Sequence, residues 1–176
     1  MATASAPGER ELTLACFRVG AQAIALDVAQ LREVVRWQPA ARLPDAPALI
    51  EGVMELRGSL VPVVDLGRAL EGPPVAGGPR ARVVVAEVEG LLLGLAVDEA
   101  LGVIPGPAAA LSALPALATR AGSAAGRALL RRPGAEPVLV LSLEHVLERV
   151  RASARPGIMG GIPSGIASGT TRSGPA

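Results

Sequence analysis

The stretch GVMELRGSLVPVVDL, residues Gly52–Leu66, carries a run of apolar residues on either side of Arg57-Gly58. Apolar side chains that recur along runs of this length predict half-buried strands, and an Arg-Gly pair between two such runs predicts a turn. The turn would therefore hold a guanidinium that stays charged at every physiological pH. Because a lone Arg-Gly is most often an ordinary solvated turn, a functional role for Arg57 needs support from the rest of the chain.

A weaker copy of this framework recurs in the second half of the chain. Two predicted hairpins, over 12–28 and over 83–97, correspond at an offset of 69 positions. At an offset of 77, the strand that precedes Asp65 corresponds to the strand that precedes Ser142. Since Asp and Ser are both good helix N-caps, we expect a short helix after each of them. The chain is therefore interpreted as a diverged duplication.

Each half holds roughly five short strands separated by turn signals, which is typical of a small closed β-barrel. A parallel sheet flanked by helices is disfavoured, because prolines interrupt the segments in which its helices would have to lie. We therefore predict a mostly β fold with two five-stranded β-barrels and short helices. The expected organisation is a flexible N-terminus (1–11), a folded domain (12–150) with barrel units over about 12–70 and 83–150, and a disordered Gly/Pro/Ser tail (151–176).

Composition limits the classes of partner. The 176 residues include 17 basic and 16 acidic side chains, so the surface is close to neutral and has no basic stripe that would follow a nucleic acid backbone. One Phe and one Trp leave little for base stacking. The N-terminus lacks the apolar segment of a signal peptide, and no apolar run predicts a membrane span, so we expect a cytoplasmic protein. Cys16, the single cysteine, is expected to be a small buried hydrophobe.

Few residues are available for catalysis or for a metal site. His145 is the single histidine, with Glu144 and Glu148 nearby, and one His with one Cys falls short of the four ligands of a structural zinc site. Asp27 and Asp98 end corresponding strands of the two halves, where a cap or turn role is favoured over an acid/base dyad. No glycine-rich phosphate-binding pattern occurs, so no cofactor is expected. The residues favour a protein without catalytic activity, with a small hydrolase built on Asp27, Asp98 or His145 as the alternative.

The order and spacing of several short motifs between Phe17 and Leu70 resemble the CheW family of chemotaxis coupling proteins. The resemblance continues through Gly94–Asp98 and through the strand and helix over 138–147, so it covers about residues 12–150. It implies two intertwined five-stranded SH3-like barrels, which agrees with the duplication. The matching motifs of the first half are Ala25-Leu26-Asp27-Val28, Leu31-Arg32-Glu33-Val34-Val35, Leu43-Pro44, Ile50-Glu51-Gly52-Val53, Leu56-Arg57-Gly58 and Val61-Pro62-Val63-Val64-Asp65-Leu66.

The resemblance implies a non-catalytic adaptor of chemotaxis signal transduction. Family members bind the regulatory domain of the histidine kinase CheA and the cytoplasmic tip of methyl-accepting chemoreceptors. Arg57 matches the arginine implicated in receptor coupling. Leu31, Glu33 and Gly52 match positions in or beside the kinase-binding face. Glu55 departs from the family, which often has Asn before Leu-Arg-Gly, and this acid is placed to pair with Arg57 and to weaken or redirect its usual contact. The implied partner-binding residues are Leu31, Glu33, Gly52, Glu55, Arg57 and Gly58. The alternative within the family is a module of another kinase pathway, such as surface motility or biofilm control.

Overall fold

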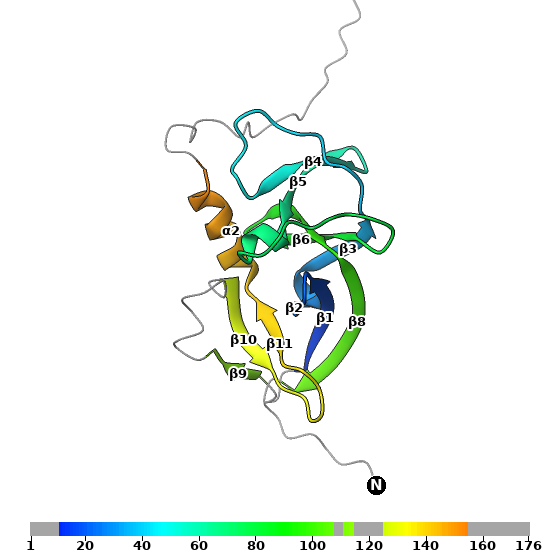
Figure 1. Ribbon diagram of the computed structural model, residues 1–176, viewed down its shortest axis with the longest axis vertical. Coiled ribbons are helices and arrows are strands. Elements are labelled where there is room, and N and C mark those ends of the chain that lie inside the picture. Colours follow the sequence, from blue (N-terminus) through cyan, green and yellow to red (C-terminus); the bar gives the residue numbers. More distant parts are fainter. Residues whose placement is uncertain (1–10, 108–110, 115–124, 155–176) are drawn as a thin grey trace, which may run out of the picture.

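Strands dominate the protein, and α2 is the longest helix among the described residues (Figure 1). The structure is a computed structural model that describes residues 11–107, 111–114 and 125–154. The prediction of a mostly β fold with short helices is confirmed. In chain order the elements are β1 (Glu11–Val19), β2 (Gln22–Asp27), the 3-10 helix η1 (Val28–Gln30), β3 (Leu31–Arg36), β4 (Ile50–Leu56), β5 (Ser59–Asp65), α1 (Leu66–Ala69), β6 (Arg82–Val88), β7 (Leu91–Val97), β8 (Glu99–Pro107), β9 (Leu111–Ala113), β10 (Gly126–Leu130), β11 (Val138–Leu141) and α2 (Leu143–Ala152).

The strands form two sheets, with the orders β8-β1-β2-β11-β10-β9 and β3-β6-β7-β5-β4. The β1–β2 hairpin of the first half lies beside strands of the second half, and the β6–β7 hairpin of the second half lies beside strands of the first. The units predicted over 12–70 and 83–150 are therefore not separate bodies, and the sheets are intertwined as the family resemblance implied. The short β9 brings one sheet to six strands rather than five. Among the described residues, strand pairing leaves two edge strands in each sheet and closes neither into a complete ring.

The register of the two parallel strand pairs supports the duplication. Val63 pairs with Gly94 where β5 runs beside β7, and Val140 pairs with Ala25 where β11 runs beside β2. An offset of 77 relates Val63 to Val140, and an offset of 69 relates Ala25 to Gly94. The two parallel strand pairs are thus equivalent, with one in each sheet. Each half gives its hairpin to the other half's sheet, and this exchange locks the halves together.

The core has one shared centre and one smaller cluster within each sheet. Ile24 and Leu26 of one sheet join Val64 and Leu95 of the other in the shared centre, and all four are fully buried. The cluster of the six-stranded sheet includes Val138 and Val140, and that of the five-stranded sheet includes their counterparts Val61 and Val63. These aliphatic side chains fill the interior that the sequence left without aromatic residues, since β-branched residues pack well on pleated surfaces.

Both predicted helix caps are present. The Asp65 side chain accepts a hydrogen bond from the Arg68 backbone N–H at 3.1 Å, and the Ser142 hydroxyl accepts one from the His145 N–H at 3.3 Å. The second helix continues through Arg151 and Ala152, two residues into the predicted tail, whereas residues 155–176 lie outside the described part, as do residues 1–10. No helix in the described part of the chain is long and apolar enough to cross a membrane.

Candidate functional site

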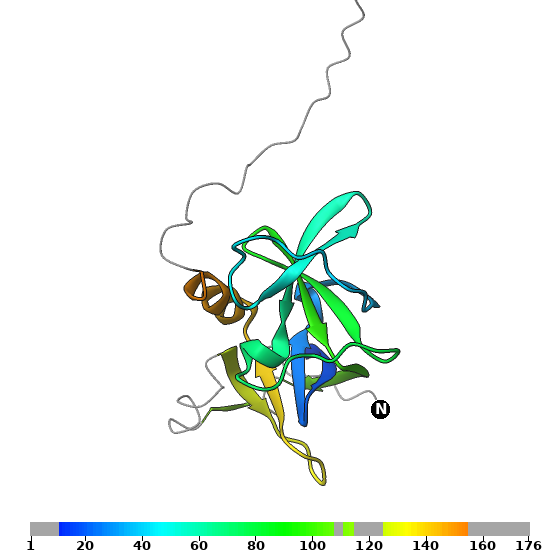
Figure 2. The ribbon, with the colours of Figure 1, turned by 45° about the horizontal axis from the view of Figure 1, so that its top comes forward.

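Arg57 lies at the end of the β4–β5 hairpin, which projects from the body of the molecule (cyan in Figure 2). Arg57 and Gly58 form the two-residue turn, with φ angles of 49° and 79°. Two consecutive residues with positive φ suit the right-handed twist of a hairpin, but this conformation is unfavourable for a residue with a Cβ atom. The predicted turn is confirmed, and the β6–β7 turn has the same geometry, with φ angles of 51° at Glu89 and 75° at Gly90.

The Arg57 side chain forms an ion pair with Glu33 of β3. Its Nη2 lies 3.1 Å from Glu33 Oε2, and the two side chains are 80% and 29% exposed. The acid expected to pair with Arg57 was Glu55, and that expectation is wrong. Glu55 pairs with Leu60 across the β4–β5 hairpin. Because Arg57 has a positive φ, the Arg57 side chain does not continue the alternation of side chains along β4. An exposed pair of this kind stabilises a fold by only about 0.2 to 1 kcal/mol.

This ion pair lies at a groove of about 510 Å³, which we call the Arg57 groove. A second ion pair at the groove joins Arg32 Nε to Glu87 Oε2 at 2.9 Å. Val61 and Val85 contribute buried aliphatic side chains to it. Charges of both signs therefore surround an apolar strip, which is a surface suited to a protein partner rather than to a small anion. The lining residues are Arg32, Glu33, Leu56, Arg57, Ser59, Val61, Val85, Glu87, Gly90 and Leu92.

Gly52 and Leu31 are held in the fold rather than presented on this groove. A Cβ atom on Gly52 would lie 2.4 Å from the backbone oxygen of Ala41, which bridges to Val53 through hydrogen bonds of 2.8 and 2.9 Å. Leu31 is partly buried against the shared core and pairs with Ala86. Of the six predicted partner-binding residues, the structure thus brings Glu33 and Arg57 together at the groove, with Gly58 in the turn and Glu55 exposed on the hairpin.

The surroundings of two carboxyl groups and one thiol group shift their pKa values. The Glu51 Oε2 atom is buried without a hydrogen-bond partner, and burial, followed by the charge of Asp65, raises the pKa of Glu51. The Ser142 hydroxyl donates to Glu144 Oε2 at 2.7 Å, and this hydrogen bond lowers the pKa of Glu144. Burial raises the pKa of the Cys16 thiol, as expected for a cysteine that acts as a core residue.

The residues considered for catalysis have structural partners or stand apart. Asp27 accepts a hydrogen bond from the Ala29 N–H at 2.9 Å and caps η1. Asp98 accepts one from the Gly20 N–H at 2.7 Å, so it fastens the β1–β2 turn. His145 is exposed on α2. No group of three or more His, Cys, Asp or Glu side chains capable of holding a metal ion occurs among the described residues.

Two exposed apolar residues at equivalent positions of two edge strands were not predicted from the sequence. Val34 on β3 is 44% exposed and Val103 on β8 is 61% exposed. Both strands end their sheets, so these side chains lie next to unpaired strand edges. The signal was available, because the offset of 69 relates Val34 to Val103. Burial in the core does not explain why both edge strands carry an exposed apolar residue at the same repeated position.

The chain is similar to known proteins over its folded part. Residues 13–151 match the family described as CheW-like domain. The "Probable chemotaxis protein CheW" of Rhizobium etli is 37% identical over 91 residues, which cover 52% of this chain and 57% of the relative. "Protein FrzA" of Myxococcus xanthus is 36% identical over 87 residues, 49% of this chain and 54% of the relative. The chain thus spans little more than half the length of these curated relatives. The crystal structure of the scaffolding protein TtCheW from Thermoanaerobacter tengcongensis has the same fold, with a TM-score of 0.72 and 24% identity over 79% of this chain and 94% of that one.

Proposed function

Because the chain belongs to the CheW-like domain family, we propose that it is a non-catalytic adaptor of a chemotaxis two-component system in the cytoplasm. It couples methyl-accepting chemoreceptors to a CheA-type histidine kinase by binding the cytoplasmic tip of the receptor and the regulatory domain of the kinase. The names of the relatives support this proposal, since they are chemotaxis and scaffolding proteins. The two intertwined sheets expose edges and a groove on which other proteins can dock.

The observation that carries the proposal is the Arg57–Glu33 ion pair on a projecting hairpin. With 80% of its side chain exposed at the end of the hairpin, Arg57 contributes little to folding and is accessible to a partner. At an interface the same guanidinium would lose water and form charge-assisted hydrogen bonds, which are about twice as strong as neutral ones. Leu60, which follows in the same hairpin, is 74% exposed and offers an apolar contact beside the charge.

The six partner-binding residues then act in two ways. Glu33, Glu55 and Arg57 contact the partner directly, because they are at least partly exposed on or beside the Arg57 groove. Gly58 permits the turn, since its φ of 79° is unfavourable for other residues. Leu31 and Gly52 act as positioning residues that hold β3 and β4 in register.

A binding titration tests this proposal. The full chain is titrated against a chemoreceptor tip fragment and, separately, against a CheA regulatory domain from the same organism. Removing Arg57 should weaken at least one complex about thirtyfold, because a well-packed interface arginine contributes about 2 kcal/mol. Arg80→Ala is the matched control, since Arg80 is 79% exposed and pairs at 3.5 Å with Glu99, which is 31% exposed. Equal affinities for wild type, Arg57→Ala and Arg80→Ala would contradict the proposal.

A second candidate is an adaptor of a different kinase pathway, such as surface motility or biofilm control. The similarity to Protein FrzA, a relative with a different name from the others, supports this candidate. The two are distinguished by the kinase: a chain that binds the regulatory domain of a kinase outside the chemotaxis system at least tenfold more tightly than that of CheA belongs to the second pathway.

A further inference from the structure

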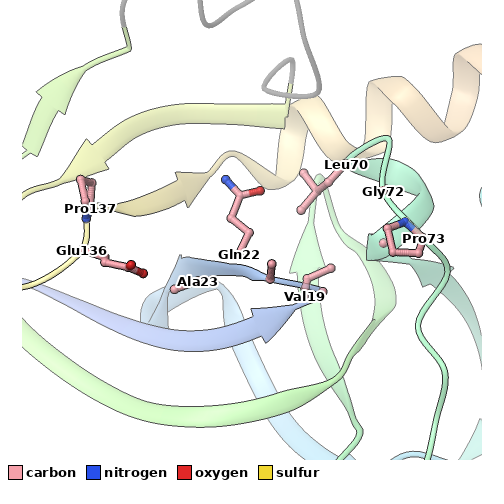
Figure 3. Close-up of a pocket in the computed structure, with 11 residues that line it drawn as sticks. Val19, Gln22, Ala23, Leu70, Gly72, Pro73, Glu136 and Pro137 are labelled. Carbon is pink, nitrogen blue, oxygen red and sulfur yellow. The ribbon is translucent and has the colours of Figure 1, made fainter.

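A second cavity, of about 480 Å³, lies where the β1–β2 turn meets α1 (Figure 3). We call it the hairpin pocket. It is separate from the Arg57 groove, with which it shares no residue. Both halves of the chain contribute to it, since Glu136 and Pro137 precede β11. The lining residues are Val19, Gly20, Ala21, Gln22, Ala23, Gly67, Leu70, Gly72, Pro73, Glu136 and Pro137.

The duplication shows what occupies the equivalent place in the other half. The counterpart of the β1–β2 turn is the β6–β7 turn, and the counterpart of α1 is α2. There the chain covers its own turn. Val150 of α2 is 7% exposed and packs in the shared core, and the Nη2 atom of Arg151 lies 2.9 Å from Glu89 Oε2 in the β6–β7 turn. An apolar residue followed by an arginine therefore joins the end of a helix to the hairpin.

The first half lacks this cover because α1 stops after four residues. The Gly72 N–H donates to the Gly67 carbonyl at 2.8 Å, and Pro73 and Pro74 then prevent the helix from continuing. The side chains are also smaller. Gly72 stands where the second half has Arg149, and Gly20 and Ala23 stand where it has Glu89 and Leu92. These three shorter residues all line the pocket.

The pocket combines apolar walls with one carboxylate, as the β6–β7 turn does for α2, but its carboxylate comes from the connection between β10 and β11. Val19, Leu70 and Pro137 give it apolar walls, and the Gln22 amide and the Glu136 carboxylate point into it (Figure 3). Neither of these two polar side chains forms an ion pair or a hydrogen bond among the described residues. No basic residue of the described part of the chain lines the pocket. Its charge therefore complements a cation that is carried next to an apolar side chain.

We propose that the hairpin pocket binds a segment of a partner protein that ends a helix with an apolar residue followed by an arginine. The segment lies against the β1–β2 turn as the end of α2 lies against the β6–β7 turn. Its apolar side chain packs against Val19 and Leu70, and its guanidinium pairs with Glu136. This inference goes beyond the proposed adaptor function and does not depend on which kinase or receptor the protein serves.

The test uses the isotopically labelled full chain and a capped synthetic peptide with the sequence of residues 143–153, LEHVLERVRAS. Saturable changes in amide chemical shifts are expected at Gly20, Ala21, Gln22 and Gly72. A peptide with Arg151→Glu should not produce them. Glu136→Gln in the protein should weaken binding about two- to fivefold, as for a partly solvated ion pair. Ala23→Leu, which copies Leu92 of the second half, should abolish the shifts while the melting temperature shows that the protein is folded.

Three results would overturn the inference. The first is the absence of shifts at these amides up to about 2 mM peptide, beyond the range of weak specific binding. The second is the same pattern of shifts with the Arg151→Glu peptide, which would show binding without charge recognition. The third is a dependence of these shifts on protein concentration in the absence of peptide, which would identify the occupant as a second copy of this chain. Glu136→Gln keeps the test valid if Ala23→Leu does not fold.

Discussion

Gly52→Ala should destabilise the protein strongly, although the family resemblance implies that Gly52 belongs to a binding face. A Cβ atom at this position would lie 2.4 Å from the oxygen and 2.8 Å from the carbon of the Ala41 carbonyl. Both are backbone atoms, so no flexible side chain can move aside. Gly52 also follows a β-bulge, where the register shifts between Ile50 and Gly52. The strand is therefore already fixed on both sides of the added methyl group.

The expected loss has two parts. Overpacking of a tight site costs about 1 to 3 kcal/mol. If Ala41 moves, its two hydrogen bonds with Val53 weaken, and each contributes about 1 kcal/mol. A total of about 2 to 4 kcal/mol corresponds to a decrease of roughly 5 to 15 °C in melting temperature for a chain of this size.

Thermal melts of Gly52→Ala and Gly72→Ala test this reasoning. Gly72 is the matched control, because the nearest atom to its added Cβ would be the Gly67 oxygen at an ordinary contact distance of 3.5 Å. Gly72→Ala should change stability by no more than about 0.5 kcal/mol. If Gly52→Ala melts within about 2 °C of wild type, the packing argument is wrong, and the direct role of Gly52 in kinase binding that the family resemblance implies is favoured instead.

Further predictions concern the carboxylates and the tail. Glu51→Gln should raise the melting temperature more at pH 7 than at pH 4. Because the pKa of Glu51 is raised in the folded protein, its carboxyl group contributes most to stability below the unfolded pKa, and this contribution is lost as pH rises through the folded pKa. Equal changes at both pH values would contradict this. Ser142→Ala should lower stability by about 1 kcal/mol through loss of the N-cap and should raise the pKa of Glu144, which carboxyl-carbon NMR measures; an unchanged pKa would show that the hydrogen bond is not its cause. Deleting residues 155–176 should leave the melting temperature within about 2 °C of wild type, since a Gly/Pro/Ser-rich segment buries little apolar surface, and a decrease of more than about 5 °C would show that it packs.

The repeated strand pattern was enough to predict the class of fold and both helix caps. It could not show the exchange of hairpins between the two sheets. A period of two in hydrophobicity records which residues are buried, but not which strand lies alongside. The apolar faces of β2 and β7 are similar, so either strand could pack in either sheet. Only the connections after Asp27 and Val97, which lead from one sheet to the other, decide the pairing.

The candidate site was predicted in part. Arg57 at a turn followed directly from the apolar runs on either side of it. Its pairing with Glu33 could not be predicted, because the turn that holds Arg57 lies 24 residues after Glu33 on β3, and local spacing pointed to Glu55 instead. The close approach of Ala41 to Gly52 depends on a long loop with no repeating pattern, so sequence alone could not separate a packing role for Gly52 from a binding role.

The most direct test of the adaptor proposal is the phosphorylation rate of the CheA-type kinase in a mixture with chemoreceptor tips and this chain. Wild-type chain should make the rate depend on the receptor, and Arg80→Ala should behave in the same way. Arg57→Ala should lose most of this dependence while it melts like wild type, because an exposed ion pair contributes at most about 1 kcal/mol to stability. A kinase rate that does not respond to the wild-type chain at any receptor concentration would contradict the proposed function.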